Sequence, residues 1–192
     1  MPENPASYRV VRKKSYLFNK AQGMSKHSYN RLGGILFTIQ AAREEANRFR
    51  ELLEKCDPST TYLIPHGFPV MSCKLCSMLL SFHFLKLWPD LELKGVSGAT
   101  GKNGAITHYW LEVGDYVIDI TGDQYNVIST SKLNEAIVKN RPFLPVHVAH
   151  RKDSYLYILF KIQGRELLTY GFPTIGNDFI DEMECDYRQL VG

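Results

Sequence analysis

The first patterned part of the chain spaces its hydrophobic residues with the period of an α-helix. Over residues 35–53 they recur every three or four positions, which predicts one helix with a single buried stripe. A loop rich in threonine, proline and glycine follows over residues 59–69. Ser72 then stands where a helix N-cap is expected, and the apolar spacing after it predicts a second helix of about fourteen residues that ends at Trp88.

After the second helix the pattern changes to the two-residue period of β-strands. Strands are predicted over residues 91–96, 107–113, 116–121, 145–149 and 155–162. Gly114-Asp115 has the composition of a tight hairpin turn between the second and third strands. The last strand is hydrophobic almost throughout, which favours a central place in the sheet. Helices followed by an antiparallel sheet predict an α+β fold.

The length of 192 residues corresponds to about one domain. We therefore interpret residues 1–192 as a single domain with a basic N-terminal arm, residues 1–30, and an acidic C-terminal extension, residues 165–192. No stretch approaches the roughly 18 consecutive apolar residues of a membrane span, and the first residues do not resemble a secretion signal. We expect a cytoplasmic protein that does not bind membranes, with export by another route left open.

The charge and cysteine content narrow the function classes. The net charge of +3 is too small a surplus to indicate nucleic-acid binding, so no nucleic-acid partner is expected. The N-terminal arm carries several Lys and Arg residues and only one acidic residue, Glu3. This arm is a candidate docking segment for a protein partner. Four cysteines are too few for a disulfide scaffold in a chain of this length, so we expect free thiols.

The predicted hairpin places chemically useful side chains together. A two-residue turn at Gly114-Asp115 puts His108 opposite Thr121 and Trp110 opposite Asp119. Side chains alternate between the faces of a sheet, so these residues share one face. His108 and Asp119 are diagonal neighbours with Cβ atoms about 7–8 Å apart or less, which allows a carboxylate–imidazole hydrogen bond.

Cys73 is the best candidate to act with this pair because it follows Ser72 and so begins the second predicted helix. The unpaired N–H groups and the positive dipole end of a helix favour the thiolate over the thiol. The same N–H groups can bind a developing oxyanion. Cys73, His108 and Asp119 would then serve as nucleophile, general base and the group that orients the base.

The motifs around these residues resemble those of the transglutaminase-like branch of the papain-like cysteine enzymes. Small bacterial members show FP-x-x-x-C, H-x-W-L-E and D-I-T-x-D-Q in this order. The corresponding stretches here are Phe68-Pro69 to Cys73, His108 to Glu112 and Asp119 to Gln124. The resemblance covers about residues 68–125. It implies a papain-like core with the cysteine helix packed on an antiparallel sheet, and the triad roles given above.

The resemblance also implies the reaction class. It is acyl transfer through a thioester on Cys73, with an amide or ester of a peptide or protein as substrate. Water as acceptor gives a peptidase or deamidase, and an amine gives transglutaminase-type transfer. This chemistry needs no cofactor and no metal. Gly67 stands where papain itself has its oxyanion glutamine, which disfavours a papain-type endopeptidase and leaves Trp110 or Gln124 as candidate oxyanion donors.

Three alternatives stay open. Cys73 and Cys76 form a C-x-x-C motif, which thiol redox proteins place at a helix N-terminus, although no βαβ pattern surrounds it here. Cys56, His66, Cys73 and Cys76 are four candidate zinc ligands at spacings that match no zinc module. A catalytically silent interaction module with the same fold is the third alternative. In the triad hypothesis, Cys76 packs as a small hydrophobic residue and Glu112 lies in solvent.

Overall fold

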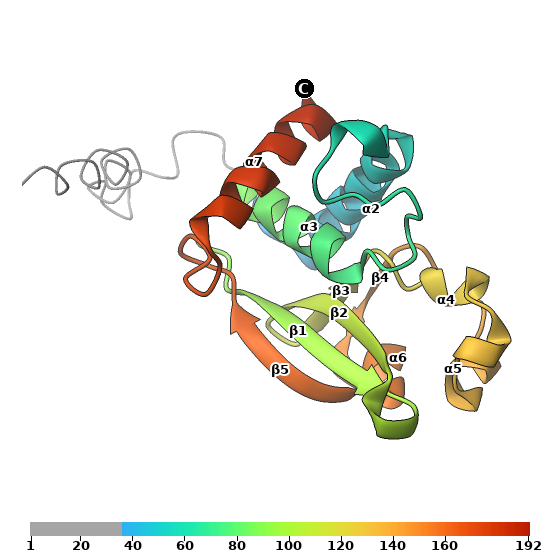
Figure 1. The fold of residues 1–192 in the computed structure, drawn as a ribbon. Helices are drawn as coiled ribbons and strands as arrows, with labels where there is room; N and C mark the ends of the chain where they lie inside the picture. The colour runs from blue at the N-terminus through green and yellow to red at the C-terminus, as the bar shows by residue number, and fades with distance from the viewer. Residues whose placement is uncertain (1–35) are drawn as a thin grey trace, which may run out of the picture. The chain divides into compact units, whose positions relative to one another are not determined.

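The computed structural model describes residues 36–192. The predicted basic N-terminal arm and the predicted helix start at residue 35 lie outside the described residues. Three long helices form a layer, and Figure 1 shows them on the same side of the sheet. They are α2 (Ile39–Lys55), α3 (Cys73–Leu87) and α7 (Asn177–Val191). Each of these three helices contacts the other two.

The sheet has five antiparallel strands in the order β4-β3-β2-β1-β5. The strands are β1 (Leu93–Thr100), β2 (Ile106–Val113), β3 (Tyr116–Asp119), β4 (His147–His150) and β5 (Lys161–Leu167). One short helix, η2 (Pro58–Thr60), lies between α2 and α3. The others lie between strands: η3 (Lys102–Gly104), α4 (Gln124–Val127), η4 (Thr130–Lys132), α5 (Glu135–Lys139), η5 (Arg151–Asp153) and α6 (Tyr155–Leu159). The fold is therefore α+β, as the sequence pattern predicts.

Side-chain alternation in the sheet divides the interior into two cores. The larger core lies between the three long helices and one sheet face, which contributes Leu93, Tyr109, Leu111 and Ile118. The smaller core lies on the opposite face, where Trp110 and Val117 pack under residues of α5, α6 and the segments beside them. Both faces of the central strands are thus covered, which leaves little room for a solvated side chain on either face.

The predicted second helix and the hairpin register are confirmed. In the β2–β3 ladder Val113 pairs with Tyr116, and Leu111 pairs with Ile118. The first helix begins at Ile39, later than expected, because the Thr38 hydroxyl accepts a hydrogen bond from the N–H of Ala41 and so fixes the N-cap. The third strand ends at residue 119, two residues earlier than predicted, and β1 continues to residue 100, beyond the predicted end at residue 96.

The prediction of a central strand over residues 155–162 is wrong. Its first part is the helix α6, where the Ser154 hydroxyl accepts a hydrogen bond from the N–H of Leu156. Its last residues open β5, which is an edge strand paired with β1 alone. A short continuous apolar run has the same pattern in a buried helix and in a buried strand. Here one helical turn buries Leu156 and Leu159 and leaves Ile158 exposed.

Residues 165–192, expected to be an acidic extension, complete the core instead. They form the end of β5 and the helix α7, which buries Met183 and Leu190 against the other long helices. Asp186 is 0% exposed, and its carboxylate accepts hydrogen bonds from the backbone N–H groups of Tyr62 and Leu63. Part of the acidic charge at this end therefore fixes the loop before α3.

Candidate active site

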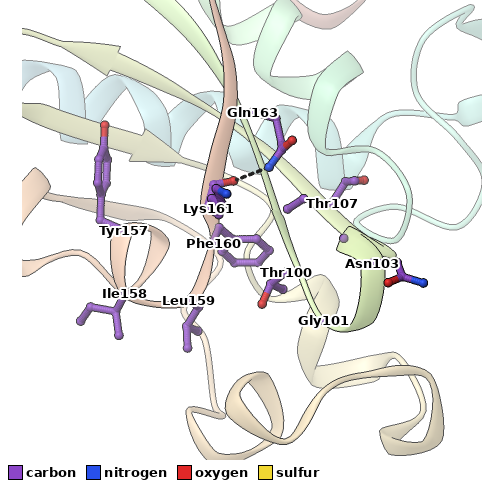
Figure 2. Close-up of a pocket in the computed structure, with 12 residues that line it drawn as sticks. Thr100, Gly101, Asn103, Thr107, Tyr157, Ile158, Leu159, Phe160, Lys161 and Gln163 are labelled. Atoms are coloured by element: carbon purple, nitrogen blue, oxygen red, sulfur yellow. Dashed lines mark hydrogen bonds between the residues drawn. The ribbon is translucent and has the colours of Figure 1, made fainter.

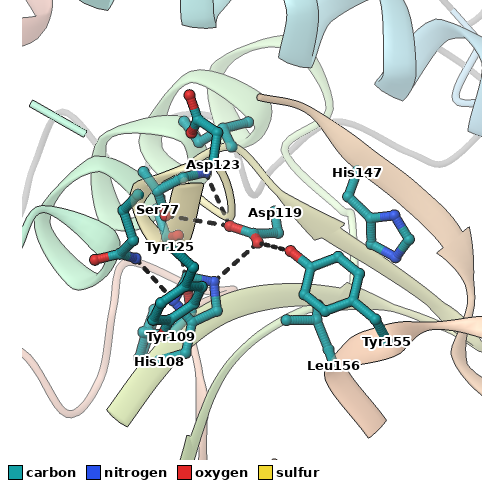
Figure 3. Close-up of polar contacts among 12 residues, drawn as sticks. Ser77, His108, Tyr109, Asp119, Asp123, Tyr125, His147, Tyr155 and Leu156 are labelled. Atoms are coloured by element: carbon teal, nitrogen blue, oxygen red, sulfur yellow. Dashed lines mark hydrogen bonds and ion pairs between the residues drawn. The ribbon is translucent and has the colours of Figure 1, made fainter. Parts of the chain in front are cut away.

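The candidate triad comes from three neighbouring elements. Cys73 is the first residue of α3, His108 lies in β2, and Asp119 is the last residue of β3. His108 Nε2 is 2.8 Å from Asp119 Oδ2, and both side chains are buried (Figure 3). The contact is the one that the hairpin register predicts. Its geometry follows from the two-residue turn, because any odd change in turn length would place the two side chains on opposite faces.

Cys73 lies against this pair. Its thiol lies close to the His108 side chain and to the backbone of Tyr109, and both favour the thiolate. Burial would raise the pKa of the Cys73 thiol, but the hydrogen bond to His108 and the charge on that ring outweigh it, so the pKa lies below its ordinary value. Because Asp119 occupies Nε2 of the imidazole, Nδ1 is the nitrogen left for Cys73.

The start of α3 differs from the expected cap. Ser72 occupies the N-cap position, but its side chain makes no capping bond. Its hydroxyl instead donates to the carbonyl of Pro69 at 2.6 Å and so closes the preceding loop. A capping hydroxyl would accept a hydrogen bond from one of the first N–H groups of the helix. With Ser72 turned away, its hydroxyl does not compete for those N–H groups beside Cys73.

Asp119 is held as a carboxylate by four hydrogen bonds. Oδ1 accepts from the backbone N–H and the hydroxyl of Thr121, at 2.9 and 3.2 Å. Oδ2 accepts from His108 and, at 2.7 Å, from the hydroxyl of Tyr155. Burial would raise the pKa of Asp119, but the charge and hydrogen bond of His108 lower it to about 2. Burial would lower the pKa of His108, but Asp119 raises it to about 10.

Gln124 links the base to the loop before the nucleophile. Its Nε2 is 3.1 Å from His108 Nδ1, and its Oε1 accepts from the N–H of Met71 at 3.3 Å. The side chain is buried, at 3% exposure. The N–H of Met71 thus fixes the amide so that its donor end faces Nδ1, and this contact is a hydrogen bond only while Nδ1 is unprotonated, after His108 has given up its proton.

Trp110, the other candidate oxyanion donor, lies beside His108 but inside the smaller core. The two rings are stacked with centroids 6.3 Å apart, and Trp110 is 0% exposed. Its indole Nε1 is buried and has no hydrogen-bond partner among the described residues. Trp110 therefore packs against the ring of the base, while Gln124 contacts its Nδ1.

Arg50 anchors the site, and the sequence pattern does not single it out. This buried α2 residue makes a two-pronged ion pair with Asp123, at 2.9 and 2.8 Å, and donates to the carbonyl of Ile120. Its guanidinium also lies 4.4 Å from the ring centroid of Phe68. Arg50 therefore joins α2 to the segment after Asp119 and to the loop before Cys73. Asp123, the second aspartate of the D-I-T-x-D-Q motif, is the one sequence signal that could have indicated a basic partner such as Arg50.

The expectation that Glu112 lies in solvent is wrong. It is 2% exposed, because its sheet face is covered by α6 and the neighbouring segments. Its carboxylate accepts from the hydroxyl of Tyr157, from Arg151 at 3.2 Å and from Arg165 at 3.5 Å. Burial with these partners identifies Glu112 as part of a polar cluster behind the candidate site.

The cysteines outside the triad form neither alternative site in the structure. All four cysteines are free thiols, and Cys76 is fully buried in the larger core. Burial raises the pKa of Cys76 to about 12, so it is protonated at neutral pH. Within residues 36–192, no group of three or more His, Cys, Asp or Glu side chains could hold a metal ion. The candidate ligands Cys56 and His66 therefore do not join Cys73 and Cys76 in a metal site.

A concave region lies next to the candidate triad without including Cys73. It has a volume of about 840 Å³ and is formed by the β1–β2 connection, the end of α6 and the start of β5 (Figure 2). Thr107, the neighbour of His108, and Phe160, whose ring centroid is 5.6 Å from that of His108, belong to its lining. The remaining polar lining includes Thr100, Asn103 and Gln163.

Comparisons of the chain with family models, curated proteins and solved structures give no match. The resemblance to transglutaminase-like enzymes therefore stays a prediction based on the motifs. Within the described residues no helix has the length and hydrophobicity needed to cross a membrane.

Proposed function

We propose that this protein is a cysteine enzyme that transfers acyl groups from an amide or ester of a peptide or protein, through a thioester on Cys73. The observation that supports this function best is the continuous set of contacts from Cys73 to His108 to Asp119, with the cysteine at a helix N-terminus. A buried imidazole that is bound to a carboxylate on its far side favours the thiolate, which a cysteine with only a packing role does not require.

The reaction starts from the Cys73 thiolate and the His108 imidazolium. The sulfur attacks the carbonyl carbon, and His108 gives its proton to the departing amine or alcohol as the bond to that group breaks. Neutral His108 then takes a proton from water or from an acceptor amine, which attacks the thioester. The carbon–sulfur bond breaks, and the thiolate and the imidazolium form again. Asp119 keeps its charge throughout and stabilises the imidazolium.

Two sets of donors can stabilise the oxyanion of each tetrahedral intermediate. The first N–H groups of α3, which begins at Cys73, have no partner within the helix. Gln124 is the better placed of the two candidate side chains, because its Nε2 lies beside the imidazole nitrogen that serves the cysteine, whereas the Trp110 indole is enclosed. The acceptor is left open between water and an amine.

The thiol redox alternative has less support. A C-x-x-C redox site forms a reversible disulfide between its two cysteines, for which both thiols must react. Cys76 is fully buried, and its raised pKa keeps it protonated. Only Cys73 of this pair therefore has the environment of a nucleophile.

Trapping of an acyl-enzyme tests the proposed function. The folded protein is mixed with the activated ester p-nitrophenyl acetate, quenched in acid and digested, and the acetylated residues are identified by mass spectrometry. We expect a thioester on Cys73 in the wild type and in the matched variant Cys76→Ser, and none at this position in His108→Ala within the same time. Equal acetylation in the wild type and His108→Ala would contradict the proposal.

A further inference from the structure

The Asp119 carboxylate carries a hydrogen bond that the acyl-transfer steps do not use. Tyr155, in α6, donates its hydroxyl to Oδ2 at 2.7 Å, and His108 Nε2 is 2.8 Å from the same oxygen. Figure 3 shows the phenol and the imidazole reaching this carboxylate from different sides. One oxygen of the orienting acid is thus shared between the base and a residue from another element.

The surrounding side chains fix the position of the Tyr155 hydroxyl. The phenol ring packs against Phe143 and His147, with centroids 4.8 and 4.6 Å away. On the other side, a Cβ atom at Gly122 would lie 2.1 Å from the Tyr155 hydroxyl and 2.8 Å from Asp119 Oδ2. No side chain fits there unless the Tyr155–Asp119 contact moves. The glycine therefore preserves the room that this hydrogen bond needs.

We propose that Tyr155 is a positioning residue that holds the Asp119 carboxylate and limits how strongly Asp119 binds the protonated His108. This inference rests on the proposed function, in which His108 must release its proton to the leaving group. A donor that hydrogen-bonds to a carboxylate stabilises its charge and makes it a weaker acceptor for a second donor. An imidazolium that is bound too tightly is a poor general acid, so the shared oxygen makes His108 a better one.

The protonation states nearby are compatible with this role. Burial, together with the charge of Asp119, raises the pKa of Tyr155 well above its ordinary value, so the hydroxyl keeps its proton. Burial lowers the pKa of His147 and raises that of Tyr125, so both side chains are neutral near pH 7. Asp123 is paired with Arg50. The charges that face Asp119 are therefore His108 and, beyond it, the Cys73 thiolate.

The strength of the His108–Asp119 bond can be read from the proton on Nε2 by NMR. A hydrogen bond that becomes stronger moves this resonance further downfield, and the loss of the resonance in His108→Gln assigns it. We expect a downfield move in Tyr155→Phe, which removes one oxygen atom. The matched control is Tyr157→Phe, whose hydroxyl binds Glu112 instead, and there we expect no move.

An unchanged or upfield resonance in Tyr155→Phe would overturn the inference while leaving the proposed function intact. A wild-type protein with no downfield resonance from His108 would overturn both, because the imidazole would then not be bound to Asp119. The two failures are therefore distinguishable without knowledge of the substrate.

Gly122→Ala tests the same contact from the opposite side. The added methyl group would lie 2.1 Å from the Tyr155 hydroxyl but 2.8 Å from Asp119 Oδ2, so the phenol must give way most, and we expect a downfield move in the same direction as in Tyr155→Phe. Combining both changes should add no further move, because the hydrogen bond is already lost. Moves that add in the double variant would show that the two residues act separately and would also overturn the inference.

Discussion

Replacing Asp119 by Asn tests the triad with little change in shape. The carboxylate has two acceptor oxygens, each with two donors, whereas the amide has one acceptor oxygen and a donor nitrogen. If the amide oxygen keeps the bonds from Thr121, its NH₂ group faces the two donors His108 and Tyr155. At least two of the four hydrogen bonds are lost in either orientation, and with them the charge that holds the imidazolium.

The loss of activity follows from this change. In serine enzymes the same substitution costs about 10⁴-fold. A thiol at a helix N-terminus depends less on its base, so we expect a loss on the order of 10²–10³ in kcat/KM, which corresponds to about 2.7–4 kcal/mol of transition-state stabilisation. The assay measures the rate of Cys73 acetylation by p-nitrophenyl acetate, which is monitored through the p-nitrophenol that the reaction releases.

Asp115→Asn is the matched control, because it removes an exposed carboxylate from the turn of the same hairpin. Its side chain is 71% exposed and 3.6 Å from Arg151, far from any triad contact. We expect wild-type rates for this variant. The reasoning would be refuted if Asp119→Asn folded with an unchanged circular dichroism spectrum and reacted at the wild-type rate.

Four further outcomes follow from the contacts around the site. The pKa of the Cys73 thiol should rise above its wild-type value in His108→Ala, because the charge and hydrogen bond of His108 no longer offset the effect of burial; the pH dependence of alkylation measures this pKa. Cys76→Ser should retain at least half of the activity and bind no stoichiometric zinc, measured by turnover and metal analysis. Ile118→Asn should lower the free energy of unfolding in urea by several kcal/mol, because Ile118 is fully buried on the opposite face, but leave Cys73 reactivity in the remaining folded protein unchanged. The stabilisation by the His108–Asp119 pair should be lost as the pH falls from 3.8 toward about 2 and as it rises from 6.5 toward about 10, measured as the difference in unfolding free energy between the wild type and Asp119→Asn.

The sequence predicts the part of the site that depends on local periodicity. The two-residue turn at Gly114-Asp115 determines the hairpin register, and the register determines that His108 and Asp119 share a face. The start of the second helix is likewise local, because the loop composition and the apolar spacing both change before Cys73. Neither inference needs information about distant residues.

The parts that depend on long-range packing could not be read from the chain. Tyr155 lies in an apolar run that fits a helix or a strand equally well, and its hydroxyl reaches Asp119 from the helix α6. Glu112 was expected in solvent because nothing in β2 itself shows that its face is covered. Arg50 is one of several charged residues in α2, and its partner Asp123 is far along the chain.

The relative reactivity of the four cysteines at pH 7 tests the central claim most directly. The folded protein is treated with limiting iodoacetamide, and mass spectrometry follows the alkylation of each cysteine in the same sample. Cys73 should react fastest, because it alone combines a helix N-terminus with a contact to an imidazolium, whereas burial raises the pKa of both Cys56 and Cys76. Equal rates at all four cysteines, or a Cys73 rate that does not change in His108→Ala, would contradict the account.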